Sequence, residues 1–301
     1  MNDRNFRQML EAQWSRGNFV CVGLDSEFSK IPESARRQTT GRTILNFNEA
    51  IVDVTKDLAC AYKPNVAFYE AYGEEGLCAL GETIGYIHKY APNVPVILDA
   101  KRGDIGSTNA GYVQAVFEYL RADAITVHPY LGVEALQPFL ARAEKGVIVL
   151  CRTSNPGAGE FQDRGVMLTD DDQVNFFGDE KEEDMDREEW PSYLPLYKYV
   201  AYKVAREWNE NSNCAVVVGA TYPGELREVR RIVGDMPILI PGIGAQGADI
   251  KKTISEGKDS RGWGMIINSS RGIIFASKGA DFAEAARRET EKLRDTINQY
   301  R

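Results

Sequence analysis

The sequence predicts an α/β fold, specifically a (β/α)8 TIM barrel, and three observations support this prediction. Eight short apolar runs rich in β-branched residues recur along the chain, and each is too short for a helix. Most of these runs are continuous rather than alternating, which is typical of parallel strands covered on both faces. Segments with helical periodicity lie between them, and 301 residues is a usual length for one undivided barrel. We therefore expect one barrel domain over residues 1–301.

The expected strands and helices alternate along the chain. Strands are expected at 19–25, 59–64, 94–101, 124–130, 146–154, 214–220, 236–244 and 264–270. Helices are expected at 43–59, 74–91, 109–122, 132–144, 223–234 and about 280–299, with an extra helix in FRQMLEAQWSR near the start. An open doubly wound sheet is the alternative, but no GxGxxG motif follows the first expected strand. The alternation therefore favours the barrel.

One stretch, at about 160–192, interrupts this alternation. It contains the acidic segments TDDDQ and GDEKEEDMDREEW and few apolar residues. Acidic runs of this kind are typical of solvated loops, so we expect an acidic loop insertion here. Because the stretch follows the fifth expected strand, a role in covering the functional end of the barrel is the alternative.

Composition and charge limit the possible partners. The net charge of −8 disfavours nucleic-acid binding, which needs a basic face, but it allows a small anionic ligand held by a few local cations. The five cysteines are odd in number and show no CxxC spacing, which indicates a reducing compartment. The N-terminus lacks the layout of a signal peptide, and no apolar run is long enough to span a membrane. We expect a cytoplasmic protein without a membrane or nucleic-acid partner.

Polar and charged residues stand where most of the expected strands end, which is where barrel enzymes carry their chemistry. These residues are Asp25, Lys63, Asp99, Lys101, Asp104, His128, Arg152, Thr153 and Ser154, followed by PGIGAQG and NSSRG after the last two strands. A barrel that required only stability would not need charge at this end. We therefore expect the functional site here.

Four of these charged residues are expected to form a row. Asp99 and Lys101 are two residues apart, so both side chains leave the inner face of the strand while Ala100 points outward. Asp104 follows the flexible Gly103 and can approach from the loop, and Lys63 can flank Asp99 from the neighbouring strand. In an alternating row of Lys, Asp, Lys and Asp, each group keeps its neighbours ionised. The alternative is an ion-pair network that only closes a barrel end.

The loops after the last two expected strands are typical of a phosphate site. Gly242, Gly244 and Gly247 allow the backbone to approach a ligand, and loops in these positions are the usual phosphate site of a barrel. Gln246 supplies an amide donor and Arg271 a bidentate cation. The alternative is that these glycines are ordinary turn residues.

Metal chemistry and serine-nucleophile chemistry are both poorly supported by the sequence. The two histidines, His88 and His128, form no HxxxH motif and have no cysteine partner at ligand spacing. No GxSxG motif exists for a Ser-His-Asp triad.

Five motifs taken in order resemble the orotidine 5′-phosphate decarboxylase family, in its longer bacterial branch. They are KPNVAFYE, LDAKRGDIGST, TSNPGAGEFQ, PGIGAQG and NSSRG, and the resemblance runs from Asp25 to about Phe275. The DxKxxD core alone is shared with a wider group of barrel enzymes, whereas DAKRGDIGST together with KPN and TSNPGA is much narrower. The acidic stretch is not typical of the family, so the resemblance implies nothing for it.

The resemblance implies an activity and a catalytic row. The activity is decarboxylation of orotidine 5′-phosphate to uridine 5′-phosphate in de novo pyrimidine biosynthesis, with neither a metal nor an organic cofactor. Lys63, Asp99, Lys101 and Asp104 match the catalytic charged row, and Lys101 would donate the proton to C6 of the pyrimidine. The family also implies a homodimer with a shared active site, in which Asp104 and Thr108 act across the interface.

The resemblance also implies a set of substrate contacts. Asp25 would hold the ribose hydroxyls, and Ser154 would read the amide edge of the pyrimidine. Gln246 and Arg271 would grip the phosphate, while Ile105 and Pro241 would wall an apolar pocket beside the scissile carboxylate. Two other functions stay open: a metal-dependent barrel enzyme acting on a sugar phosphate, and a nucleotide-binding protein without catalysis.

Overall fold

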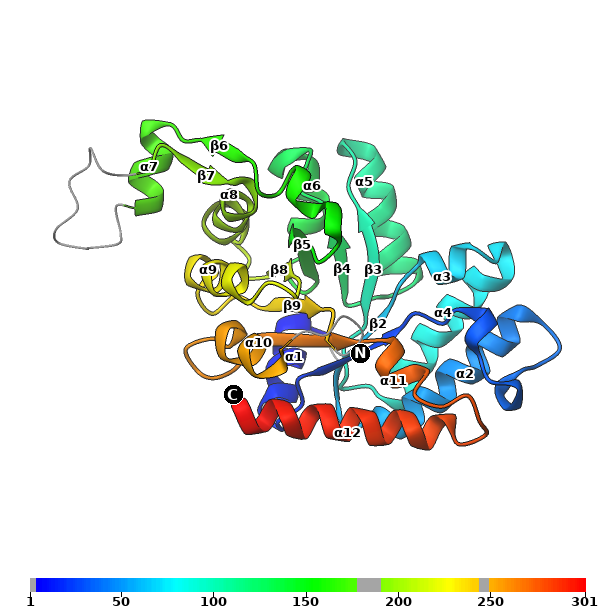
Figure 1. The fold of residues 1–301 in the computed structure, drawn as a ribbon. Helices are drawn as coiled ribbons and strands as arrows, with labels where there is room; N and C mark the ends of the chain where they lie inside the picture. Colours follow the sequence, from blue (N-terminus) through cyan, green and yellow to red (C-terminus); the bar gives the residue numbers. More distant parts are fainter. Residues whose placement is uncertain (1–3, 178–190, 244–248) are drawn as a thin grey trace.

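The computed structural model describes residues 4–177, 191–243 and 249–301. Within them, eight parallel strands stand side by side and helices surround them (Figure 1). The strands are β1 (Val20–Leu24), β2 (Ala59–Pro64), β3 (Ile97–Arg102), β4 (Ala124–Val127), β5 (Gly146–Arg152), β8 (Cys214–Val218), β9 (Ile238–Pro241) and β10 (Met265–Ser269). Each lies within one residue of a stretch predicted from the sequence. All eight predicted strands are therefore confirmed.

The sheet closes into a barrel. The strand order is β2-β1-β10-β9-β8-β5-β4-β3, with parallel pairing between the barrel strands. The two ends of this order meet through the parallel bridges Tyr62↔Val96 and Asn65↔Asp99. The seam between β2 and β3 also carries the backbone hydrogen bonds from Tyr62 N to Pro95 O and from Val66 N to Asp99 O. The predicted (β/α)8 barrel is confirmed.

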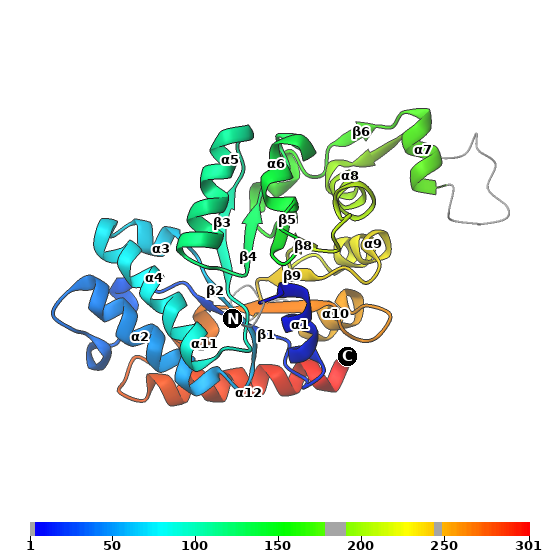
Figure 2. The same cartoon turned by 180° about the vertical axis from the view of Figure 1, so that it is seen from behind.

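Helices follow the strands and cover the outside of the barrel (Figures 1 and 2). They are α1 (Phe6–Trp14), α2 (Thr40–Thr55), α3 (Ala67–Glu70), α4 (Gly73–Tyr90), α5 (Gly106–Val113), α6 (Gly132–Leu140), α8 (Leu196–Lys203), α9 (Pro223–Val233), α10 (Ile250–Gly257), α11 (Arg271–Ile274) and α12 (Phe282–Tyr300). All the predicted helices are present, and α3, α8, α10 and α11 are additional. Helix α2 begins where Thr39 accepts a hydrogen bond from Arg42 N, and α10 begins where Asp249 accepts one from Lys252 N.

Apolar residues fill the space between the strands and the helices. All residues of β1, β2, β4, β8 and β10 are buried, which fits strands covered on both faces. Trp14 on α1 is fully buried and stacks with Phe19 just before β1. Phe6 lies so close to Gly146, at the start of β5, that a Cβ there would come within 2.2 Å of its ring. Helix α1 therefore packs against the amino ends of the strands.

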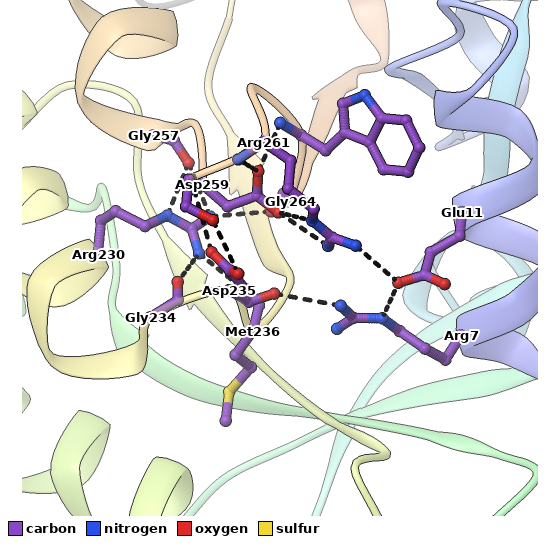
Figure 3. A network of polar contacts seen from close by, with 12 residues as sticks. Arg7, Glu11, Arg230, Gly234, Asp235, Met236, Gly257, Asp259, Arg261 and Gly264 are labelled. Atoms are coloured by element: carbon purple, nitrogen blue, oxygen red, sulfur yellow. Dashed lines mark hydrogen bonds and ion pairs between the residues drawn. The ribbon is translucent and has the colours of Figure 1, made fainter.

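A buried guanidinium ties the amino ends of β9 and β10 together (Figure 3). Arg230 of α9 donates hydrogen bonds from Nη1 to the carbonyls of Gly234 and Met236. Its Nε and Nη2 donate to the carbonyl of Gly257, and Nη2 also donates to that of Gly264. These carbonyls belong to the segments that lead into β9 and β10, so Arg230 fixes the two segments relative to α9.

The acidic stretch contains regular structure in its described part. Strand β6 (Gly165–Met167) pairs antiparallel with β7 (Tyr193–Pro195), and α7 (Asp170–Phe177) lies between them in sequence. The hairpin and α7 extend away from the barrel beyond α8 (Figures 1 and 2). The described part of the predicted acidic loop insertion therefore contains β6 and α7, whereas 178–190 lie outside the described residues. Among the described residues, no helix is both long and apolar enough to cross a membrane.

Candidate active site

Three of the predicted catalytic residues meet at the carboxyl end of the barrel. Lys63 Nζ, from β2, lies 2.8 Å from Asp99 Oδ2 on β3, and Lys101 Nζ lies 2.6 Å from Asp99 Oδ1. Asp25 follows β1, and its Oδ1 lies 3.8 Å from Lys63 Nζ. Each carboxylate oxygen of Asp99 therefore receives its own ammonium, and two carboxylates flank Lys63.

Burial differs sharply along this row. The side chain of Lys63 is 4% exposed and that of Asp99 is 12% exposed, whereas the side chain of Lys101 is 49% exposed. Lys63 is thus enclosed by protein, and Lys101 is the cation of the row that a ligand can reach.

Mutual pairing keeps the buried members of the row charged. Burial alone would lower the pKa of Lys63, but the carboxylates of Asp99 and Asp25 outweigh it and raise the pKa above its ordinary value. Burial would likewise raise the pKa of Asp99, but Lys63 and Lys101 hold that pKa well below its usual range. Both groups are therefore ionised throughout the neutral range.

The backbone that carries Asp99 and Lys101 is bulged. Leu98 pairs with Ile125 and Arg102 with Val127, so three residues of β3 stand opposite Thr126 alone on β4. Within this bulge Lys101 adopts φ 48°, a left-handed conformation that is uncommon for a residue other than glycine.

Thr126 lies opposite this bulge and was not predicted from the sequence as a site residue. Its hydroxyl accepts hydrogen bonds from the backbone N–H groups of Ala100 and Lys101, both at 3.0 Å, and donates one to Asp99 Oδ1 at 2.9 Å. A polar residue inside the otherwise apolar run AITV of the fourth expected strand was the available signal.

Asp104 does not join the row within one chain, which corrects the expectation from spacing. Among the described residues its carboxylate forms no ion pair, and it accepts a hydrogen bond from its neighbour Ile105 N at 2.7 Å. The backbone of Asp104 is held by the amide of Asn109, which donates to its carbonyl and accepts from its N–H. Ile105, at the start of α5, is 63% exposed, and Thr108 on α5 is exposed as well.

His128 supports the loop that leads to Asp104. Its Nε2 lies 3.0 Å from the carbonyl oxygen of Gly103, and its Nδ1 accepts a hydrogen bond from Tyr130 N. A Cβ on Gly103 would come within 2.5 Å of the imidazole, so glycine permits this approach. His128 thus connects the loop after β3 with the loop after β4.

Ser154 follows β5 in a loop that the protein holds firmly. The side chain of Gln162 accepts a hydrogen bond from Thr153 N at 2.8 Å and exchanges others with the Thr153 hydroxyl. Arg152, which is buried, donates to Gln162 and Asp163, and its guanidinium lies 4.5 Å from the ring centre of Tyr222. Ser154 is half-buried and lies against Gly219. A Cβ added to Gly219 would be 2.7 Å from the Cβ of Ser154.

Two of the predicted substrate-binding residues, Pro241 and Arg271, lie at the end of β9 and just after β10. Pro241 ends β9 and is half-buried, and Gly242 follows with φ 101°. Arg271 is exposed at the first position of α11. Gln246, Gly244 and Gly247 lie outside the described residues. Nearby, Asn268 Oδ1 and Ser270 Oγ are buried without a hydrogen-bond partner among the described residues.

Comparison with known proteins gives a consistent result. Residues 18–288 match the profile of the Orotidine 5′-phosphate decarboxylase / HUMPS family. The protein named orotidine 5′-phosphate decarboxylase from Ralstonia pickettii (strain 12J) is 47% identical over 297 residues, which cover 98% of this chain and 99% of that protein. Its namesake from Cellvibrio japonicus (strain Ueda107) is 43% identical, covering 99% of each chain. The solved structure of Leishmania donovani OMP decarboxylase has a TM-score of 0.76 and 33% identity, covering 98% of this chain and 99% of that one.

The barrel, the charged row and these comparisons together define the class of protein as a decarboxylase built on a (β/α)8 barrel. More particularly, the chain belongs to the orotidine 5′-phosphate decarboxylase family, because the profile and the relatives match it over nearly its full length. The resemblance carried by the sequence motifs is confirmed. Among the described residues, no group of three or more His, Cys, Asp or Glu side chains is arranged to hold a metal ion.

Proposed function

We propose that this enzyme converts orotidine 5′-phosphate to uridine 5′-phosphate and carbon dioxide, with Lys101 as the proton donor. The observation that carries the proposal is the Lys63–Asp99–Lys101 row at the carboxyl end of the strands. Family membership supports the substrate and a role in pyrimidine biosynthesis. The row supports the chemistry.

The chemistry requires stabilisation of a localised charge. When carbon dioxide leaves C6 of the pyrimidine, the electrons of the broken bond stay on C6 as a vinylic carbanion, with no carbonyl placed to delocalise them simply. An ammonium held beside C6 attracts that carbon more strongly as the charge develops. Lys101 then transfers a proton to C6, which gives the product, and the neutral amine regains a proton from water.

The neighbours of Lys101 prepare it for this step. Asp99 contacts the Lys101 ammonium at 2.6 Å and thereby orients it, while Lys63 holds the other oxygen of Asp99. Because the side chain of Lys101 is half-exposed and that of Lys63 is enclosed, we assign proton donation to Lys101 and charge balance to Lys63.

The remaining residues are proposed to bind the nucleotide. Asp25, whose buried Oδ1 has no hydrogen-bond partner among the described residues, would accept from a ribose hydroxyl. Ser154 would read the pyrimidine amide edge, Ile105 and Pro241 would wall the pocket for the departing carboxylate, and Arg271 with Gln246 would bind the phosphate. Contacts with the distant phosphate can be used to position the ring at the row.

An ultraviolet assay for the loss of orotidine 5′-phosphate tests this function. The purified enzyme is expected to consume the substrate and to keep its rate in the presence of a chelator. No turnover would overturn the proposal. Turnover that stops with chelator and returns with a divalent cation would favour the metal-dependent alternative.

Arg271→Ala tests the phosphate assignment. Loss of a charge-assisted hydrogen bond should weaken uridine 5′-phosphate binding about 10- to 100-fold. Binding of uridine, which lacks the phosphate, should be unchanged in the same variant. Titration calorimetry of both ligands on both proteins gives the comparison, and equal weakening for the two ligands would refute the phosphate role.

We also propose a homodimer in which Asp104 and Thr108 reach the partner's site. The loops after β3 and β4 expose large apolar side chains, with Ile105 at 63%, Tyr130 at 86% and Leu131 at 45% exposure. Exposed apolar side chains of this size support a protein interface at these loops. Asp104, without an ion-pair partner among the described residues of its own chain, is hydrogen-bonded to the backbone of Ile105.

Mixing two inactive variants tests the shared site. After subunit exchange between Lys101→Ala and Asp104→Ala chains, a mixed dimer has one site with both residues intact. With random exchange half of the dimers are mixed, so about a quarter of wild-type activity should return. Mixed dimers that form without any gain in activity would exclude the shared site.

Cytoplasmic location is a further proposal. All five cysteines lie within the described residues and are free thiols, four of them buried. Free thiols are typical of a reducing compartment. Fractionation that finds the enzyme in an oxidising compartment would contradict it.

A further inference from the structure

We propose that Thr126 is a positioning residue of the reaction: its hydroxyl holds the bulge of β3 and so sets the direction of the Lys101 ammonium and the Asp99 carboxylate. The proposal rests on the proposed function of Lys101. Thr126 is 1% exposed, so it acts through its neighbours rather than by touching the nucleotide.

The pairing of β3 with β4 creates the need for such a residue. Between the pairs Leu98↔Ile125 and Arg102↔Val127, β3 has three residues where β4 has one. The N–H groups of Ala100 and Lys101 therefore cannot both find a regular partner carbonyl on β4. A bulge of this kind re-aims the side chains that it carries, and here these include both Asp99 and Lys101.

The Thr126 hydroxyl satisfies both N–H groups. A hydroxyl can accept two hydrogen bonds and donate one, and Thr126 Oγ1 does all three. It accepts from Ala100 N and Lys101 N, both at 3.0 Å, and it donates to Asp99 Oδ1 at 2.9 Å. One oxygen atom thus joins the backbone of the proton donor to the carboxylate that orients its ammonium.

The conformation of Lys101 provides a second, independent observation. Its φ of 48° is unfavourable for a side chain with a Cβ and persists only where surrounding contacts hold it. The hydrogen bond from Lys101 N to Thr126 and the ion pair from its Nζ to Asp99 are those contacts. Without the hydroxyl, the backbone can relax and move the ammonium away from its present position.

Asp99 depends on the same hydroxyl for its orientation. Its carboxylate receives hydrogen bonds from three strands: from Lys63 on β2, from Lys101 on β3 and from Thr126 on β4. The first two donors end flexible side chains, whereas Thr126 has a short, stiff one. Thr126 is therefore the contact that fixes the carboxylate relative to the barrel.

The experiment compares Thr126→Val, which keeps the shape and removes the hydroxyl, with Thr126→Ser, which keeps the hydroxyl. Thr126→Val should lower kcat at least about tenfold, because small displacements of reacting groups are costly. Its affinity for uridine 5′-phosphate should change by less than about threefold, since Thr126 touches no ligand. Thr126→Ser should restore kcat to within about threefold of wild type.

The matched control is Thr290→Val in α12. Thr290 is fully buried, and its hydroxyl donates to the carbonyl of Ala286 at 2.7 Å, so the same chemical change is made away from the site. This control should lose stability without losing kcat. If Thr126→Val does not fold, Thr126→Cys replaces it, because a thiol is a weak donor and acceptor of similar size; kcat should again fall.

Crystal structures of wild type and Thr126→Val separate this inference from the proposed function. The inference expects φ of Lys101 to leave the left-handed region and the Lys101–Asp99 contact to lengthen, whatever reaction the enzyme performs. An unchanged bulge, or a folded Thr126→Val enzyme with wild-type kcat, overturns the inference. Wild-type enzyme that does not turn over orotidine 5′-phosphate overturns the proposed function instead.

Discussion

Buried cations lie at both ends of the barrel, and they differ in what satisfies them. At the amino end, Arg230 makes five hydrogen bonds to four backbone carbonyls, which uses every N–H of its guanidinium (Figure 3). At the carboxyl end, Lys63 is paired with the carboxylate of Asp99 and lies near that of Asp25. Neutral carbonyls hold the first cation, and a charged row holds the second.

The two ends also differ in what they leave open. The guanidinium of Arg230 has no unused hydrogen-bond donor, so it only connects segments of the chain to one another. The carboxyl end presents a half-exposed Lys101 ammonium and a buried Asp25 oxygen without a hydrogen-bond partner among the described residues. Buried polar groups are normally satisfied, so an oxygen without a hydrogen-bond partner at the same end of the barrel as a reachable cation indicates a place completed by a ligand.

The largest effect that would sharpen this contrast is expected from Lys101→Ala. We expect kcat to fall at least about a thousandfold, because both electrostatic stabilisation and the proton donor are removed. Binding of uridine 5′-phosphate should stay measurable, and the free energy of unfolding should change little because the side chain is half-exposed. Stopped assays with calorimetry test this, and Lys56→Ala, whose side chain is 38% exposed, is the control. A rate near wild type would end the assignment of Lys101.

The opposite result is expected at the amino end. Arg230→Met should lower the free energy of unfolding by about 3–5 kcal/mol, because it leaves buried carbonyls without a donor. The kcat per folded molecule should stay at the wild-type value. Urea denaturation measures the loss, and Arg231→Met, whose side chain is 72% exposed, is the matched control, expected within about 0.5 kcal/mol of wild type. Equal losses for the two variants would contradict the structural role.

The smallest expected effect concerns pH and belongs to the charged row. The pKa of Asp99 is depressed in the folded state, so its ionised form stabilises the fold above the unfolded pKa of about 4. That contribution is lost as the pH falls below about 4. The free energy of unfolding of wild type should therefore fall more steeply below that pH than that of Asp99→Asn. Urea denaturation at a series of pH values checks the slopes, and parallel slopes would show that Asp99 is not held ionised.

The barrel and most of the row could be predicted because they follow from local patterns. Continuous apolar runs identify buried parallel strands, and the strand period places Asp99 and Lys101 on the same face. The bulge at residues 99–101 could not be predicted, because it depends on the register between β3 and β4, which the sequence of one strand does not contain. For the same reason Thr126 was missed.

Two other features depend on contacts distant in sequence. The spacing of Asp104 from Lys101 predicted that it would join the charged row. Instead, the side-chain amide of Asn109 holds the backbone of Asp104 in the loop after β3. Arg230 shares a helix face with Leu226 and Val233, so the helical periodicity places it on the buried face. Only the carbonyls before β9 and β10 explain why a cation is tolerated there.

The seam that closes the barrel has a consequence for how this family can change. Strands β2 and β3 meet through two isolated bridges, and the Lys63–Asp99 pair spans the same junction. A homologue that lost the reaction and replaced Lys63 or Asp99 would also weaken the junction between β2 and β3 that closes the barrel. Loss of the catalytic activity by such a substitution therefore requires a new contact between β2 and β3. Changes in catalysis and changes in barrel stability are linked in this chain for that reason.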